Sequence, residues 1–135
     1  KLSTEELAFL MAAGGGEEDV FARLWQGPAQ FIVVTDGARG LRWYTRGNHG
    51  GLPAFSVSAV DTTGAGDAFI AGLLYRLGDA GIGAKDLARL ADDDTRRDDM
   101  LRFAAACGAL AVTRAGSFAA MPTRDAVHAF LQQHA

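Results

Sequence analysis

A glycine-rich turn, DTTGAGD at residues 61–67, lies between a run that alternates apolar and polar residues (55–60) and a run that is apolar on nearly every side (68–77). Alternation of this kind is typical of a strand. A run with so little polar surface is typical of a buried helix. A strand that passes through a glycine turn into a buried helix favours a layered α/β domain.

The rest of the sequence fits the same architecture. A continuous apolar run at 31–34, rich in β-branched residues, predicts a strand buried on both faces. Turn residues follow it, and a second strand at 41–45 is expected to return antiparallel. Further elements are predicted by apolar spacing and by caps: helices at 3–13, 17–26, 67–77, 84–90, 98–114 and from residue 123, a turn at 46–50, and a third strand at 55–60. We therefore expect an α/β fold with a sheet covered by helices.

Composition limits the function classes. The 135 residues fit one domain and are 49% hydrophobic and 21% charged, with a net charge of −3. This charge argues against broad binding of nucleic acid or acidic membranes, and no apolar run reaches the roughly 20 residues that span a bilayer. Cys107 is the single cysteine, which rules out an internal disulfide framework and favours a reduced, cytoplasmic setting. The mixed charges at 92–99 predict a solvated loop and helix start.

The glycine turn has the chemistry of an anion site. The first amides of a helix lack intrahelical partners, and the helix dipole adds positive potential there, so phosphates bind at such termini. Gly64, Ala65 and Gly66 have no side chain large enough to keep a phosphate from those amides. Asp67, on the first turn of the helix, is placed to accept a proton from an attacking hydroxyl.

A plainer interpretation remains open. The segment is not a P-loop, because no Gly-Lys-Ser/Thr follows, and it is not a GxGxxG fingerprint. As a generic Gly-x-Gly turn it is equally well explained as a tight turn, with Asp67 serving as an acidic residue at a helix N-terminus.

The full string AVDTTGAGDAFIAGLL at 59–74 resembles the C-terminal fingerprint of the ribokinase (PfkB-type) carbohydrate kinases. The resemblance covers essentially the whole chain, 1–135, and GSFAAMPT at 116–123 leans towards fructokinases. It implies a ribokinase-like layered sheet with helices on both faces, of which only the C-terminal, nucleotide-binding part is present. The sugar-binding N-terminal half and its lid would lie outside the chain. It also implies ATP-dependent phosphorylation of a sugar, with Asp67 as general base and Gly64–Gly66 as anion hole.

The resemblance assigns the nucleotide to two further segments. VTDGARG at 34–40 looks like the family turn that lies along the nucleotide, matched by Thr35, Gly37 and Gly40. In the segment at 102–122, Ala105 and Gly108 would lie near adenine. Ala105 stands where a polar residue is common in the family, which puts a hydrogen bond to the base in doubt. Simple helix packing also explains residues 104–112.

Two metal ions are implied in the same way. KLSTEEL at 1–7 resembles a family segment in which Glu6 acts through water on Mg²⁺ and the ATP phosphates, with Ser3 nearby. The same residues form a capping box, which is the competing interpretation of Glu6. A K⁺ site would draw on backbone and side chain at Asp61, Thr63, Ala111, Arg114, Gly116 and Ala120.

The expected partners are a small-molecule sugar and ATP, without nucleic acid or membrane, and a homodimer of the complete protein is one arrangement that the resemblance allows. Other acceptors remain alternatives to fructose: 2-keto-3-deoxygluconate, ribose, tagatose phosphate or a nucleoside. A nonenzymatic nucleotide-binding module is the alternative from another class. The chain starts at KLSTEEL without Met, which fits either a processed or truncated product or a domain cut from a longer protein.

Overall fold

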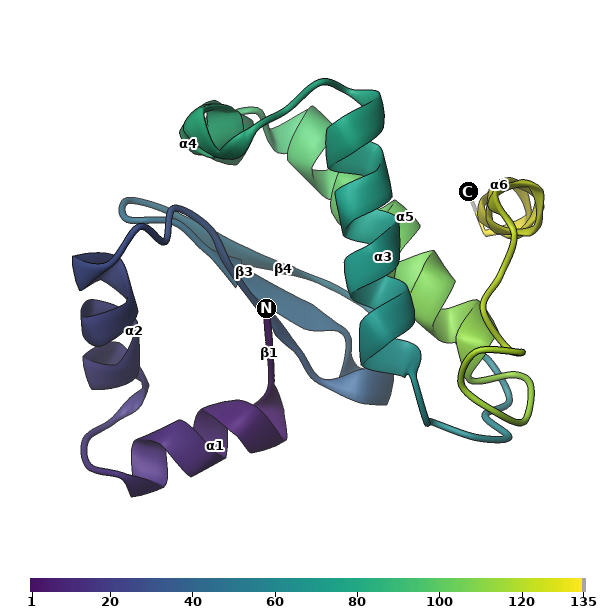
Figure 1. Cartoon of the computed structure of the whole chain (residues 1–135), viewed down its shortest axis with the longest axis horizontal. Coiled ribbons are helices and arrows are strands. Elements are labelled where there is room, and N and C mark those ends of the chain that lie inside the picture. The colour runs from purple at the N-terminus through teal and green to yellow at the C-terminus, as the bar shows by residue number, and fades with distance from the viewer. Residues whose placement is uncertain (135) are drawn as a thin grey trace.

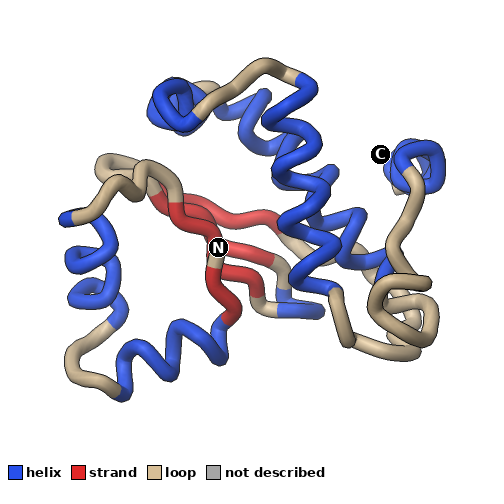
Figure 2. Tube along the Cα trace, viewed as in Figure 1, coloured by secondary structure: helices blue, strands red, loops and turns tan. Residues whose placement is uncertain are grey.

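The computed structural model describes residues 1–134, apart from the side chain of residue 91, and arranges them as a sheet between two groups of helices (Figures 1 and 2). The elements in chain order are β1 (Leu2–Ser3), α1 (Thr4–Ala12), α2 (Glu17–Gln26), β2 (Ile32–Thr35), the 3₁₀ turn η1 (Gly37–Arg39), β3 (Leu41–Tyr44), β4 (His49–Leu52), α3 (Ala65–Asp79), the 3₁₀ turn η2 (Ala84–Asp86), α4 (Leu87–Asp92), α5 (Asp94–Ala111) and α6 (Arg124–Gln133).

The sheet has the strand order β1-β2-β3-β4. β1 runs parallel to β2, whereas β2, β3 and β4 are joined as antiparallel neighbours. Val33 pairs with Trp43, and Trp43 pairs with Gly50 across the next ladder. The parallel pair β1–β2 places the start of α1 beside the turn that follows β2, and this juxtaposition forms one end of the site described below.

β2 is buried on both faces, as its β-branched sequence predicts. Ile32 and Val34 pack against α1 and α2, in a cluster that includes Leu7, Val20 and Phe21. Val33 points to the opposite face and packs with Leu41, Trp43, Phe69, Leu101 and Ala104, so α3 and α5 cover that side. Helices therefore lie on both faces of the sheet, and the α/β prediction is confirmed.

Small residues bring α3 and α5 into close contact. A Cβ added to Gly72 would lie 2.6 Å from Cys107 Sγ and 3.2 Å from Ala104 Cα, so only glycine fits without a shift of α5. Cys107 is buried in this contact, and burial raises the pKa of its thiol to about 11. The close contact fixes the N-terminus of α3 relative to the C-terminal half of α5.

We expect Gly72→Ala to lower the free energy of unfolding of the complete protein by about 1–3 kcal/mol, because the added methyl overpacks the α3–α5 contact. Cys107→Ala removes the sulfur, so the glycine substitution should cost less in that background. Denaturant unfolding of the four variants of this double-mutant cycle measures the difference. Gly78→Ala on the same helix meets nothing within 4 Å and is the matched control. Equal costs in both backgrounds would show that the sulfur is not what Gly72 accommodates.

The third strand was placed wrongly by the sequence. Residues 55–60 form neither helix nor strand. The strand β4 lies instead at His49–Leu52, which begins inside the turn predicted at 46–50 and extends past it. Glycine is required in β4 because a Cβ on Gly50 would lie 2.7 Å from the Trp43 ring. In the 55–60 segment, Phe55 and Val57 are half-buried and Ser56 is exposed. The alternation of apolar and polar residues therefore arises because one side of the segment is covered, although no strand pairs with it.

The charged segment 92–99 is solvated as predicted except at Arg97, and the helix that it starts has other bounds. α5 begins at Asp94, with Asp93 as its N-cap, rather than at Asp98, and it ends at Ala111 rather than Arg114. Arg97 is only 3% exposed, and its guanidinium lies 3.6 Å from the centroid of the Trp43 ring. Asp94 and Asp98 pair with it. An arginine stacked on a core tryptophan therefore lies within a segment that charge alone assigns to solvent.

The apolar helix α3 is buried on one side only. Ala68, Phe69 and Gly72 are buried against the sheet and α5, so the prediction of a buried helix holds for this side alone. Ile70, Leu74 and Tyr75 are exposed, Leu74 by 61%. The sequence cannot distinguish these two sides because both are apolar, and within residues 1–134 no element covers the outer one.

Candidate active site

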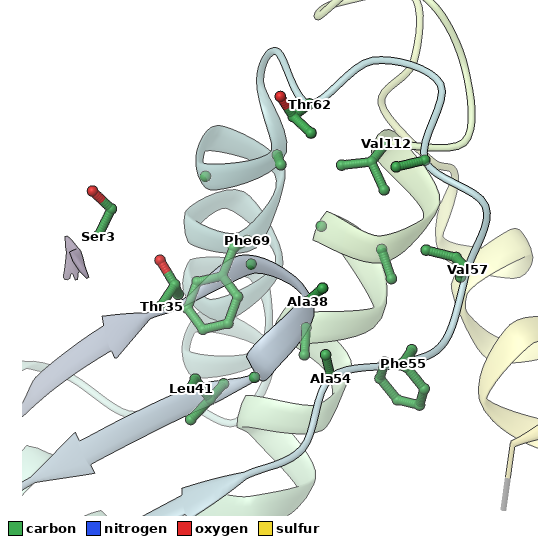
Figure 3. A pocket seen from close by; sticks show the side chains of 18 of the residues that line it. Ser3, Thr35, Ala38, Leu41, Ala54, Phe55, Val57, Thr62, Phe69 and Val112 are labelled. Carbon is green, nitrogen blue, oxygen red and sulfur yellow. The ribbon is translucent and has the colours of Figure 1, made fainter. Parts of the chain in front are cut away.

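A cleft of about 670 Å³ lies between the β2–β3 turn, the N-terminus of α3 and the C-terminal half of α5 (Figure 3). This volume is within the range of ligand sites for nucleotide-sized molecules. Residues from five segments line the cleft: Lys1, Ser3, Glu5; Thr35, Gly37, Ala38, Gly40, Leu41; Pro53–Val57 and Ala59; Thr62, Ala65, Gly66, Phe69; and Ala105, Gly108, Ala109, Val112. Most of these side chains are small or apolar. The cleft therefore suits a planar ring better than a charged group.

The β2–β3 turn forms one wall. Thr35 ends β2, η1 follows, and Gly40 at φ 102° begins the return into β3. Asp36 accepts two hydrogen bonds from Arg39, both at 2.7 Å, and a third from the Thr4 hydroxyl at 3.1 Å. The Arg39 guanidinium holds the pKa of the Asp36 carboxyl below its usual range. These bonds tie the turn to the start of α1.

The C-terminal half of α5 and the residue that follows it form the opposite wall, and none of the side chains that they contribute to the lining is larger than valine. Ala105 and Gly108 both line the cleft, as the resemblance to the kinases predicts for residues near the base. A Cβ on Gly108 would lie 3.2 Å from the Ala65 carbonyl oxygen, so glycine here lets α5 approach the N-terminus of α3. Ala105 offers no hydrogen-bonding group from its side chain, so it gives a base only an apolar contact.

The N-terminus of α3 opens onto the cleft through Ala65 and Gly66. Gly64 is the N-cap and adopts a left-handed conformation, φ 80° and ψ 0°, which L side chains rarely adopt. A Cβ on Gly64 would also lie 2.9 Å from Ser117 Cβ. The first helical bond runs from Ala68 N to Gly64 O at 2.9 Å, and the amides of Gly66 and Asp67 have no acceptor among residues 1–134. Those two amides are thus available to an anion.

Asp67 does not line the cleft. Its side chain is exposed on the outer side of α3, in the first turn of the helix, and makes no hydrogen bond or ion pair within the described part of the chain. Asp67, Ile70 and Leu74 follow the spacing of one helix face. The carboxylate therefore lies at the end of the uncovered apolar side of α3, on the same helical turn as the amides and outside the lining of the cleft.

The competing interpretation of Glu6 is the one that the structure displays. Glu6 Oε2 accepts from the Ser3 amide at 2.6 Å, and Ser3 Oγ accepts from the Glu6 amide at 3.1 Å, a complete capping box. The Ser3 amide holds the pKa of the Glu6 carboxyl below its ordinary value. Ser3 lines the cleft, whereas Glu6 does not, and the acidic side chain in the wall is that of Glu5. Within residues 1–134, no group of three or more His, Cys, Asp or Glu side chains converges on a metal position.

The residues expected to surround K⁺ lie on two segments that the structure joins. Asp61 Oδ1 accepts from the Thr63 amide and Oδ2 from the Gly116 amide, both at 2.9 Å. Val60 and Asp61 donate to the Val112 carbonyl at 2.7 and 3.2 Å. Ala111 and Ala120 are buried and Arg114 is exposed, so the guanidinium points to solvent rather than into this contact.

Asp61 gives this junction a pH dependence. Its two amide donors hold the pKa of the carboxyl below its ordinary value. A carboxyl with a lowered pKa in the folded state stabilises that state above its unfolded pKa, and the contribution is lost as the pH falls through the lowered value. The stability difference between wild type and Asp61→Ala should therefore be constant near neutrality and shrink below about pH 4. Denaturant unfolding of both proteins from pH 7 to 3 tests this, and parallel profiles would contradict it.

The structure thus brings together eight of the residues that the sequence singled out: Ser3, Thr35, Gly37, Gly40, Ala65, Gly66, Ala105 and Gly108. Lys1 was missed, although it lines the same cleft. Lys1 belongs to the KLSTEEL segment, in which the sequence analysis assigned roles only to Ser3 and Glu6. None of the helices in the described part is both long enough and apolar enough to cross a bilayer.

A layered α/β fold in which a glycine turn opens a helix N-terminus onto a cleft defines a class of proteins that bind phosphate-bearing ligands. Residues 1–124 match the family model described as pfkB family carbohydrate kinase. The chain belongs to this family, and its fold is part of the ribokinase-like fold.

Relatives and solved structures agree. Fructokinase-1 from Zea mays is 39% identical over 127 residues, which are 94% of this chain and 37% of that enzyme. The crystal structure of fructokinase with bound ATP from Xylella fastidiosa superposes with a TM-score of 0.93 at 42% identity and covers 98% of this chain and 42% of that one. A fructokinase double mutant from Vibrio cholerae O395, in a form with fructose, ADP and potassium ion bound, gives a TM-score of 0.75 at 34% identity, covering 96% and 39%. The chain spans about two fifths of the length of these proteins.

Proposed function

We propose that the complete protein carrying this chain is an ATP-dependent sugar kinase and that fructose is its acceptor. One observation carries the proposal: the N-terminus of α3 opens onto the cleft, with Ala65 and Gly66 in the wall and Asp67 next along the chain. A phosphate held by the free amides at that terminus would lie between the cleft and the side of α3 that bears the carboxylate. The relatives named fructokinase support fructose over other sugars.

The nucleotide would occupy the cleft along the β2–β3 turn. Thr35, Gly37 and Gly40 flank it on one side, and Ala105 and Gly108 pack against the base on the other. Its terminal phosphoryl group would reach the amides of Gly66 and Asp67. Mg²⁺, bound chiefly by phosphate oxygens, would neutralise charge on the triphosphate, with Glu6 acting through water. Glu6 uses one carboxylate oxygen for its cap, so its second oxygen is the one available for this role.

The helix amides and the Asp67 carboxylate have separate roles in the reaction. The oxygen of a sugar hydroxyl forms a bond to the terminal phosphorus, and its proton passes to the Asp67 carboxylate. The bond between that phosphorus and the bridging oxygen of ADP breaks, and ADP leaves with the electron pair. The helix amides stabilise the charge on the transferring phosphoryl oxygens. Asp67, being exposed, returns the proton to solvent.

The junction between residues 61–64 and 111–120 would hold the glycine turn in register. Asp61 fixes the amides of Thr63 and Gly116, and Ser117 packs on Gly64. A K⁺ ion bound by carbonyls of this junction would act on the turn rather than on the sugar, so it would promote activity without contacting either substrate.

A panel of acceptors tests the proposal. The complete protein is assayed for ADP release with MgATP and, in turn, fructose, ribose, 2-keto-3-deoxygluconate, tagatose phosphate and a nucleoside. The highest kcat/KM is expected for fructose. A higher kcat/KM for another acceptor would change the assigned acceptor but keep the kinase activity. Absence of phosphorylation with every acceptor would reject the kinase activity.

A nonenzymatic nucleotide-binding module is the second candidate. The exposure of Asp67 favours this second function, because the described part of the chain does not cover the carboxylate with residues that could hold a sugar there. A complete protein that binds ATP in a calorimeter but transfers phosphate to no acceptor in the panel would decide for this function.

A further inference from the structure

We propose that the end of α6 positions one wall of the nucleotide cleft through Phe55, so that Phe130 and His134 set the nucleotide affinity without touching the nucleotide. Neither of the two lines the cleft. This inference deepens the proposed function, because it rests on a nucleotide in the cleft. The family model matches residues 1–124, so both side chains lie beyond the matched part of the chain.

The wall formed by residues 54–57 has little support from the backbone. All four residues of this segment line the cleft, and Figure 3 shows the segment along one side of it. Among residues 1–134, the backbone of 54–59 makes no hydrogen bond. The segment is fixed only at its ends, where Ala54 packs on Gly40 and the Val60 amide donates to the Val112 carbonyl at 2.7 Å. Side-chain contacts must therefore fix its middle.

Phe55 makes these contacts, and most of them are with α6. Its ring meets the Phe130 ring edge-on, with centroids 5.1 Å apart and 72° between the planes. The His134 ring meets it in the same way, at 5.6 Å and 83°. The Arg102 guanidinium, from α5, lies 5.4 Å from the centroid of the Phe55 ring. Edge-to-face ring pairs at such distances stabilise a position beyond the burial of area alone.

The end of α6 is itself well ordered. Phe130 and His134 stack with centroids 4.1 Å apart and 29° between the planes. His134 Nδ1 lies 2.8 Å from the Phe130 carbonyl oxygen, and Arg102 Nη2 donates to the His134 carbonyl at 3.1 Å. Arg102 thus links α5 to the end of α6 while it lies over Phe55. The stacked pair of rings therefore contacts Phe55 as one unit.

Phe55 lies at the end of the cleft where the base would bind. Arg102, which contacts Phe55, precedes Ala105 by three residues on α5, so the two are neighbours on one face of that helix. Ala105 gives a base only an apolar contact, so the base depends on how closely the walls of the cleft fit it. A shift of Phe55 should weaken this fit. The amides at the N-terminus of α3, where phosphate would bind, should be unaffected.

The test compares His134→Ala with His128→Ala in the complete protein. His128 is the matched control, because it lies on the same helix and its ring contacts Phe103, with centroids 5.5 Å apart, rather than Phe55. Calorimetry with Mg²⁺ gives the affinities for ATP and ADP, and kinetics with the best acceptor give kcat at saturating ATP. His134→Ala should weaken ATP and ADP by the same factor, roughly tenfold, because both carry the base. Its kcat should stay within about twofold, as expected when only uniform binding is lost. His128→Ala should match wild type.

Two further variants show whether His134 acts through Phe55. Phe55→Leu should weaken ATP by a similar factor, and adding His134→Ala to it should weaken ATP by less than about twofold more. His134→Phe keeps an aromatic ring against Phe55 and should bind ATP within about threefold of wild type.

Equal ATP affinities for His134→Ala and His128→Ala would overturn the proposal. A full tenfold effect of His134→Ala in the Phe55→Leu background would do the same, and so would a fall in kcat that parallels the fall in affinity. Should His134→Ala not fold, His134→Phe decides: wild-type affinity supports the proposal, and a loss as large as that of Phe55→Leu contradicts it. The binding measurements need no sugar. A wild-type protein that binds ATP but phosphorylates no acceptor would therefore reject the proposed function, while the affinities would still decide the role of α6.

Discussion

Replacing Asp67 by Asn is expected to lower kcat for sugar phosphorylation by roughly a thousandfold or more, because an amide cannot accept the proton of the attacking hydroxyl. ATP affinity should stay within about twofold, since Asp67 does not line the cleft that would hold the nucleotide. The substitution should also leave the fold intact, because the exposed Asp67 side chain makes no hydrogen bond within the described residues. Steady-state kinetics of the complete protein and calorimetry with MgATP measure the two effects.

Asp79→Asn is the matched control. Asp79 lies on the same helix, is exposed like Asp67, and is at the opposite end from the glycine turn. The same chemical change there should leave kcat and ATP affinity unchanged. Turnover of Asp67→Asn within about tenfold of wild type would remove the general-base role, because general base catalysis contributes at least a hundredfold in typical enzymes. The amides at the helix terminus would then have to account for catalysis.

The strongest elements of the fold were predictable because local chemistry and tertiary packing agree. Ser3 and Glu6 form the predicted capping box, and the β-branched run at 31–34 is buried on both faces. The glycine turn leads into α3 as expected, with Gly64 at a positive φ. In each case the local preference of the residue types and the packing of distant segments favour the same conformation.

The errors arose where a distant residue decides the outcome. The sequence predicts a turn at 46–50, yet His49 and Gly50 belong to β4, where the Trp43 ring lies against Gly50. Residues 55–60 alternate like a strand, but they have no pairing strand, and Phe55, Ser56, Val57 and Ala59 line the cleft instead. Arg97 appears among solvated charges, yet it lies on Trp43. Strand pairing and ring stacking with residues far along the chain cannot be recognised from the local sequence at these positions.

The same distinction applies to the site. Fingerprint residues such as Gly64 and Gly66 can be identified because their backbone role restricts the residue type. Lys1 has no such restriction, and only the fold brings it against Gly66. Asp67 is intermediate: the sequence places it on the first turn of α3, whereas its exposure on the uncovered side of that helix follows from the packing of α3 on α5.

The largest loss of stability is expected at Gly40, the residue that returns the β2–β3 turn into β3. Gly40 has φ 102° and ψ −142°, a conformation essentially confined to glycine. A Cβ there would lie 2.2 Å from the Leu52 carbonyl oxygen and 3.0 Å from Pro53 Cα. Both neighbours are backbone, so relief requires β4 to move away from β3 rather than a side chain to rotate.

We therefore expect Gly40→Ala to lower the free energy of unfolding by about 3 kcal/mol or more, the sum of backbone strain and overpacking. ATP affinity should fall with it, because Gly40 and its neighbours form one wall of the cleft. Gly47→Ala is the control: Gly47 lies in the next turn, meets nothing within 4 Å and has no positive φ, so its effect should stay within about 0.5 kcal/mol. Denaturant unfolding of both variants of the complete protein gives the comparison. Similar free energies of unfolding for the two variants would contradict the prediction. They would mean that the β2–β3 turn can move away from Leu52 at little cost, and that this wall of the cleft is flexible.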